Sequence, residues 1–203
     1  MINFIHIPKN GGNSLIKLCK NNIKHHDHSV DVSNSDISNQ FIIIRNPIER
    51  FISAVYYALQ YYNNKDHIKC LLSHKIDTPE KWVQIWKNPS HQYYNILMNE
   101  MKNKNQIIGT TYHEYKWTYL PQSIWINNPK YICIMDNYQE EVTYLFKKIL
   151  KRDIYLPKNN STIYHNDILS DDSIKYLEIF YSKDFFYYNK YKNISIEERI
   201  PIV

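Results

Sequence analysis

Residues 6–14, HIPKNGGNS, combine residue types that bind phosphate. They hold two of the only three glycines in the 203 residues, directly after Lys9. Glycines let the backbone approach phosphate oxygens closely, while Lys9 supplies a mobile positive charge and Asn13 and Ser14 can add hydrogen bonds. This pattern predicts an anion-binding loop. The alternative is a tight turn between a strand and a helix, beside a solvated lysine.

A second segment, IIIRNPIERFISAVYY at residues 42–57, places polar residues behind an apolar run. Arg45 directly follows the run, and Ser53 lies two turns into the next helix, where it should face away from the core. Taken singly, either would be an ordinary surface or helix residue. Because ligands bind at the carboxyl ends of parallel strands, the loops of both segments should open on the same side of a sheet. Together they predict two phosphate sites that flank one nucleotide.

The first segment needs a strand, a loop and a helix, in that order. Residues 2–7 are rich in β-branched side chains and stop at Pro8, which is typical of a buried strand. Residues 15–19 have the apolar spacing of a helix, and Asn13 or Ser14 would cap it. An anion in the loop would then lie at the positive end of that helix.

The second segment predicts the same order. Residues 41–44 are a continuous apolar run, as in a strand covered on both faces. A helix start follows, because Asn46 can serve as N-cap, Pro47 fits the first helical position and Glu49 completes a capping box.

The remaining chain continues the alternation of strands and helices. Residues 131–135 predict another buried strand, a helix follows at about 139–150, and a last helix begins near Ser170. Residues 26–32 would add a short strand. Since the chain has no repeat and no long linker, we expect a single domain over residues 1–203. Its class is α/β, with a mostly parallel central sheet flanked by helices.

Composition narrows the class of protein. Hydrophobic residues make up 43% of the chain and charged residues 22%, as in a soluble folded protein. The net charge of +5 favours anionic ligands only weakly. Three cysteines without a CxxC pair argue against a disulfide framework and favour a reducing compartment. With no apolar run of membrane-spanning length, we expect a soluble, cytoplasmic protein without a nucleic acid partner.

Both segments resemble those of a known family. HIPKNGGNS is similar to the 5′-phosphosulfate loop of sulfotransferases that use PAPS (3′-phosphoadenosine 5′-phosphosulfate), where HIPKTGGTS is typical. IIIRNPIERFISAVYY resembles their 3′-phosphate segment, RDPxERxxSxYY. The resemblance is closest to the Golgi carbohydrate branch, which includes heparan sulfate 2-O-sulfotransferase. It extends weakly through LPQS at 120–123, through residues 134–150 and through residues 181–188.

The resemblance implies a P-loop-like sulfotransferase fold and a set of cofactor contacts. Lys9 would contact the bridging region of the phosphosulfate, and Arg45 and Ser53 would hold the 3′-phosphate. The residues implied around the 5′-phosphate are Asn10, Gly11, Gly12, Asn13 and Ser14.

Three positions depart from the family pattern. Asn10 and Asn13 stand where threonines are usual, and Asn46 replaces an aspartate. Asparagine can still donate hydrogen bonds to phosphate. A Golgi location would require a membrane anchor outside this sequence.

The implied activity moves a sulfonate group from PAPS to a hydroxyl of a carbohydrate or similar acceptor and releases PAP (3′-phosphoadenosine 5′-phosphate). Such a transfer needs a base near the sulfonate. The 2-O-sulfotransferases carry a catalytic His-x-His at the place where this chain has KHHDH, residues 24–28. The resemblance therefore implies His28 as the base, with His26 orienting it or sharing the task. Lys9 is the third predicted catalytic residue.

Other interpretations stay open on the sequence. His26, Asp27 and His28 would suit a metal site, although no second ligand cluster with recognisable spacing accompanies them, and a solvated histidine loop is the simpler alternative. A P-loop nucleotide kinase would need a lysine after the glycines, and here the lysine precedes them. A nucleotide-binding or glycan-binding module without catalysis is the third alternative.

Overall fold

A four-stranded sheet stands at the centre of the molecule. The structure is a computed structural model that describes residues 2–18, 23–27, 32, 39–97, 118–156 and 168–201. Within these ranges the strands are β1 (Ile2–Ile5), β2 (Ile23–His26), β3 (Gln40–Ile44) and β4 (Tyr131–Ile134). All three strand pairings are parallel, which confirms the predicted α/β class with a parallel sheet flanked by helices.

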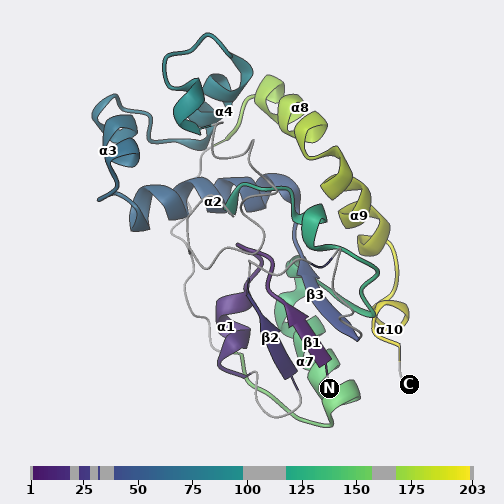
Figure 1. Ribbon diagram of the computed structural model, residues 1–203. Helices are drawn as coiled ribbons and strands as arrows, with labels where there is room; N and C mark the ends of the chain where they lie inside the picture. Colours follow the sequence, from purple (N-terminus) through teal and green to yellow (C-terminus); the bar gives the residue numbers. More distant parts are fainter. Residues whose placement is uncertain are drawn as a thin grey trace.

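The strand order places a reversal between β1 and β3. The order is β2-β1-β3-β4 (Figure 1), so the chain steps from β1 to one side to form β2 and then returns to the other side to form β3. In open parallel sheets, ligands bind outside the carboxyl ends of the strands at such a reversal. The two segments singled out in the sequence directly follow β1 and β3, and therefore meet at this place.

Both faces of the sheet are covered, as the continuous apolar strands require. One face packs against α1 (Gly12–Ile16) and α7 (Tyr138–Leu150), with Phe4 and Phe146 in its core. The other face carries Ile42 and packs against η2 (Gln122–Trp125) and α9 (Ser182–Lys192).

A third core lies among helices beyond the sheet. Phe51, Trp82 and Trp86 are buried there, and Figure 1 shows this group of helices above the strands. Its helices are α2 (Pro47–Tyr61), α3 (Asp66–Ser73), α4 (Pro79–Lys87) and α8 (Asp171–Phe180). The chain also forms η3 (Met135–Asn137) after β4 and α10 (Ile196–Arg199) near the C-terminus. None of the helices in the described ranges is long and apolar enough to cross a membrane.

The predicted cap of α2 and the predicted start of α8 are both confirmed. Asn46 Oδ1 accepts hydrogen bonds from two backbone N–H groups of α2, and Ser170 caps α8. The prediction for α1 is wrong, because Gly11 is its N-cap and Asn13 and Ser14 lie inside the helix. Gly11 takes that place because its left-handed backbone, with φ of 75°, turns the chain into the helix.

The second strand lies earlier in the chain than predicted. It spans Ile23–His26, where residues 26–32 were expected to form it. The apolar Ile23 is buried at its start, while the polar KHH residues continue it at the sheet edge, where one side of a strand stays unpaired. Residues 28–31 lie outside the described ranges.

Candidate functional site

Lys9 and Arg45 join the two loops that follow β1 and β3. The guanidinium Nη1 of Arg45 donates a hydrogen bond to the Lys9 carbonyl oxygen at 3.2 Å. The Lys9 backbone has φ of 65°, an uncommon left-handed conformation for a residue with a side chain. These residues are 36 positions apart in sequence, so the contact brings together the two predicted anion-binding segments.

The Lys9 ammonium group lies near an aromatic ring and two further cations in the described part of the chain. It lies 3.9 Å from the centroid of the Tyr57 ring, a cation–π contact. Burial, followed by repulsion from Arg45 and Arg50, lowers the pKa of Lys9 to about 8. An anion bound beside these cations would relieve the repulsion and raise that pKa.

Both glycines have a packing reason that is independent of a ligand. A Cβ atom on Gly12 would lie 2.0 Å from Cδ2 of the buried His6 ring. A side chain on Gly11 would combine a positive φ with contacts of 3.1 Å to Met135 and Tyr138. The Tyr138 hydroxyl also donates to the Gly11 carbonyl oxygen at 3.0 Å, which ties this loop to α7. The turn interpretation of the glycines therefore has direct support, and it does not exclude an anion at the same loop.

The polar residues around the glycines point in different directions. Asn13 is exposed and Ser14 is buried in the first turns of α1. Asn10 is 2% exposed, and its Nδ2 donates to the Ile43 carbonyl oxygen at 2.7 Å and to Gln122 Oε1 at 3.0 Å. The Asn10 amide thus fastens the loop after β1 to β3. The predicted contact between Asn10 and phosphate stays a prediction.

The second predicted site residue, Ser53, lies deeper than expected. The sequence predicted that it faces away from the core, yet its side chain is only 2% exposed. This face of α2 is buried because the helix lies between the third core on one side and the loops after β1 and β3 on the other. Arg45 is also largely buried, and its Nε lies 3.5 Å from the carboxylate of Glu49. Glu49 also forms the first hydrogen bond of the predicted capping box, because its backbone N–H donates to Asn46 Oδ1 at 3.3 Å.

Arg50 is a site residue that the sequence did not reveal. It is 1% exposed, with Nε donating to the Pro8 carbonyl oxygen at 2.9 Å and Nη1 donating to the Leu120 carbonyl oxygen at 2.7 Å. Its Nη2 has no hydrogen-bond partner in the described part of the chain. The only signal in the sequence was a charged residue one turn after the cap of α2, which is usually solvated.

A buried carboxylate stands near these cations. Asp184 on α9 accepts hydrogen bonds from the backbone N–H groups of Gln122 at 2.7 Å and Ser123 at 2.8 Å. Burial raises the pKa of Asp184, and the charge of Arg50 opposes that shift. Its two oxygens thus cap the start of η2, so that Asp184 offsets Arg50 through space instead of pairing with it directly.

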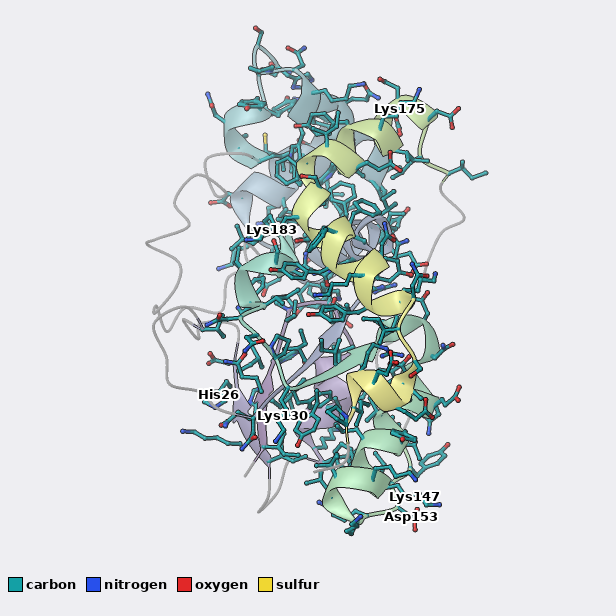
Figure 2. The ribbon with its side chains drawn as sticks, turned by 90° about the vertical axis from the view of Figure 1, so that its right-hand side faces the viewer. His26, Lys130, Lys147, Asp153, Lys175 and Lys183 are labelled. Atoms are coloured by element: carbon teal, nitrogen blue, oxygen red, sulfur yellow. The ribbon has the colours of Figure 1, made fainter. Side chains whose placement is uncertain are left out.

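Of the two predicted bases, His26 lies at the carboxyl edge of the sheet beside the loop after β1, because its carbonyl oxygen accepts from the His6 backbone N–H at 3.0 Å. His26 ends the edge strand β2, and Figure 2 shows it on one flank of the molecule, with Lys147 of α7 on the opposite flank. His26 Nε2 lies 2.9 Å from Asn3 Oδ1. Because an amide oxygen only accepts, this contact places the proton on Nε2 and the lone pair on Nδ1. His28 lies outside the described residues.

The surroundings of His26 favour its neutral form. Burial, followed by the charges of Lys24 and His25, lowers its pKa, while Asp27 acts in the opposite direction. A neutral imidazole is the state that can accept a proton. Within the described ranges, no three His, Cys, Asp or Glu side chains gather as a metal site would require.

We compared the sequence and the fold with known proteins. No protein-family model, no curated protein and no solved structure matches the chain.

Proposed function

We propose that this protein is a PAPS-dependent sulfotransferase with a P-loop-like sulfotransferase fold. It would transfer a sulfonate group to a hydroxyl of a carbohydrate or similar acceptor and release PAP. The proposal combines the resemblance of HIPKNGGNS and IIIRNPIERFISAVYY with the meeting of these two segments at the reversal of the strand order.

The contact between Arg45 and Lys9 is the observation that supports the proposal most. A nucleotide that carries phosphate at both its 3′ and 5′ positions needs two cationic sites held at a constant separation. The Arg45 side chain reaches the backbone of the Lys9 loop at 3.2 Å, so the two segments hold these two cationic residues next to each other at the carboxyl edge of the sheet.

The residues at this place fit an anionic co-substrate. Lys9 and Arg45 are cations, and burial lowers the pKa of Lys9, so its ammonium form gains from a bound anion. The first backbone N–H groups of α1 have no intrahelical acceptor, as at the start of any helix. PAPS would supply the sulfonate group. Lys9 would stabilise the charge that gathers on the departing 5′-phosphate oxygen, and Arg45 with Ser53 would orient the 3′-phosphate.

The acceptor hydroxyl would form the new bond to sulfur as the bond between sulfur and the phosphate oxygen breaks. The hydroxyl proton would pass to a base, for which the resemblance implies His28, with His26 assisting. The lowered pKa of His26 suits its assisting role, since a protonated imidazole could not take the proton.

Binding of the product nucleotide is the first test. Calorimetric titration should give measurable PAP affinity, and incubation with radiolabelled PAPS and a panel of glycans should label at least one acceptor. If neither PAP binding nor transfer to any acceptor is found, the proposal is wrong. ATP turnover in the same preparation would favour the nucleotide-kinase alternative instead.

The assignment of the base is tested separately. His28→Ala should lower turnover about a hundredfold while PAP affinity stays close to that of the wild type, because a base acts on the acceptor and not on the nucleotide. His26→Ala is the matched comparison and should have the smaller effect. Near-normal turnover of His28→Ala would refute the assignment, and a parallel collapse of PAP binding would indicate a structural role.

A binding module without catalysis is the second candidate function. The hydrogen bond between His26 and Asn3 favours it, because one nitrogen of this histidine already serves to join β2 to β1. This candidate predicts PAP binding with no transfer to any acceptor in the panel.

A further inference from the structure

Gln122 connects the two loops of the candidate site through its side-chain amide. It is 0% exposed and begins η2, far from both loops in sequence. Its Oε1 accepts from Asn10 Nδ2 at 3.0 Å and from the Arg45 backbone N–H at 3.2 Å. Its Nε2 donates to the Arg45 carbonyl oxygen at 2.8 Å. One amide thus holds the loop after β1 and both backbone groups of the residue that follows β3.

Gln122 is itself held rigidly. The carboxylate of Asp184 accepts from the Gln122 and Ser123 backbone N–H groups, at 2.7 and 2.8 Å. Arg50 also links the segment before Gln122 to the loop after β1, because its guanidinium donates to the carbonyl oxygens of both Leu120 and Pro8. Because the backbone of Gln122 is anchored independently, the length of its side chain sets where the amide lies between the loops.

We propose that Gln122 is a positioning residue that sets the separation of the two anion-binding loops and thereby the selectivity for a 3′,5′-bisphosphorylated nucleoside. This inference rests on the proposed function, since it assumes that Lys9 and Arg45 contact different phosphates of one ligand. A ligand that touches both loops depends on their separation, whereas a ligand that touches only one loop does not.

A purely structural role of Gln122 would change the nucleotide affinities in a different way. Loss of buried hydrogen bonds destabilises the fold and lowers the affinity of any nucleotide that binds there. A positioning role instead changes the ratio of two affinities. The probes are PAP and AMP, which share the adenosine and the 5′-phosphate, and of which only PAP carries the 3′-phosphate.

The test uses calorimetric titration of PAP and AMP into the full-length protein and two Gln122 variants. Gln122→Asn keeps the amide and shortens the side chain by one methylene group, so one amide can no longer reach both loops. We expect it to lower PAP affinity about tenfold and AMP affinity less than about threefold, as for the loss of one buried hydrogen-bonded link. Gln122→Glu keeps the length, replaces the donor to Arg45 by an oxygen and adds a negative charge beside both loops. The charge should lower the affinity of both nucleotides, while the retained reach to both loops should leave the ratio of PAP to AMP affinity intermediate.

A control variant separates positioning from stability. Val83→Ala removes two methyl groups from the third core, which contains no residue of the candidate site. It should lower the thermal unfolding temperature while leaving the ratio of PAP to AMP affinity at the wild-type value. If Gln122→Asn does not fold, the ratio measured for Gln122→Glu decides, because this variant keeps the shape of the side chain.

Each outcome has one meaning. A ratio that falls in the order wild type, Gln122→Glu, Gln122→Asn supports the inference. A wild-type ratio in either Gln122 variant overturns it and leaves the proposed function standing. If the wild-type protein binds neither PAP nor AMP, the proposed function fails first, and the role of Gln122 in selectivity fails with it.

Discussion

Two buried arginines in this protein are partnered in different ways. Arg199 of α10 donates from Nη1 and Nη2 to the two carboxylate oxygens of Glu141, at 2.6 and 2.8 Å, and its other hydrogen bonds go to backbone carbonyls. Arg50 of α2 donates only to backbone carbonyls, and its Nη2 has no hydrogen-bond partner within the described ranges.

The Arg199–Glu141 contact is thus a neutral structural pair, whereas the surroundings of Arg50 carry surplus positive charge. Around Arg199 the charge is balanced, because a bidentate carboxylate faces the guanidinium. Around Arg50, the nearby Asp184 binds backbone N–H groups, while Lys9 and Arg45 add two more cations and the largely exposed Glu49 beside Arg45 adds one carboxylate. A buried cation that the fold does not pair directly is a candidate for pairing with a ligand, whereas Arg199 has no such capacity left.

The largest expected effect comes from breaking the balanced pair. Arg199→Ala leaves Glu141 buried without its cation and should lower the free energy of unfolding by about 3–5 kcal/mol. Urea unfolding followed by circular dichroism measures this loss. Lys87→Ala, which removes an ion pair with Asp172 whose carboxylate is largely exposed, is the matched control and should cost about 1 kcal/mol or less. PAP affinity per folded molecule should not change in either variant, and a loss in Arg199→Ala would contradict the separation of the two regions.

The next effect concerns ligand binding at the unbalanced region, by which we mean Lys9, Arg45 and Arg50. Arg45→Ala should weaken PAP binding by roughly 1.5–3 kcal/mol, which is tenfold or more, since a charge-assisted contact to phosphate is lost. Adenosine 5′-phosphosulfate, which lacks the 3′-phosphate, should lose less affinity in the same titration. Glu49→Gln is the control, because it removes the nearby carboxylate and should leave PAP affinity equal or higher. Equal losses for both ligands in Arg45→Ala would place Arg45 away from the 3′-phosphate.

A smaller effect is expected when the loop of the unbalanced region is overpacked. Gly12→Ala would bring a methyl group to 2.0 Å from the His6 ring, so the ring or the loop must move. The expected loss of unfolding free energy is about 1–3 kcal/mol, as for other overpacked cores. Ser14→Ala, two residues further along α1, is the control and should leave stability close to the wild-type value. A Gly12→Ala variant as stable as the wild type would mean that the loop does not pack on His6.

The smallest expected effect is the dependence of PAP affinity on pH through the ionisation of Lys9. PAP should bind the ammonium form of Lys9 more tightly, and this form is lost in the free protein as the pH rises through about 8. PAP affinity should therefore fall by at most about tenfold per pH unit above that value, because one proton is involved, and binding there should take up a proton. Calorimetry between about pH 7 and about pH 9.5, in buffers of different ionisation enthalpy, measures both effects.

Lys9→Arg is the control for the pH experiment. Its guanidinium stays charged over the whole range, so the dependence of PAP affinity on pH should disappear. An affinity that rises with pH in the wild-type protein, or a dependence that persists in Lys9→Arg, would assign the titration to another group.

The candidate site was predictable only where it depends on residues close in sequence. The apolar runs predicted β3 and β4, the Asn46 cap predicted where α2 begins, and a helix was predicted to begin near Ser170, where α8 begins. The cap of α1 was not predictable from side-chain preferences, because the left-handed Gly11 turns the chain into that helix without a side-chain hydrogen bond.

The sequence by itself determined the order of the strands and helices and the position of Lys9 and Arg45 just after two buried strands. These features follow from local periodicity, helix caps and the rule that parallel strands share one carboxyl edge. Only the tertiary structure decided that Arg50 and Gln122 are buried beside them, and that His6 packs on Gly12. Their burial depends on partners tens of residues away in sequence, and a polar residue tolerates burial only where such partners accept and donate its hydrogen bonds.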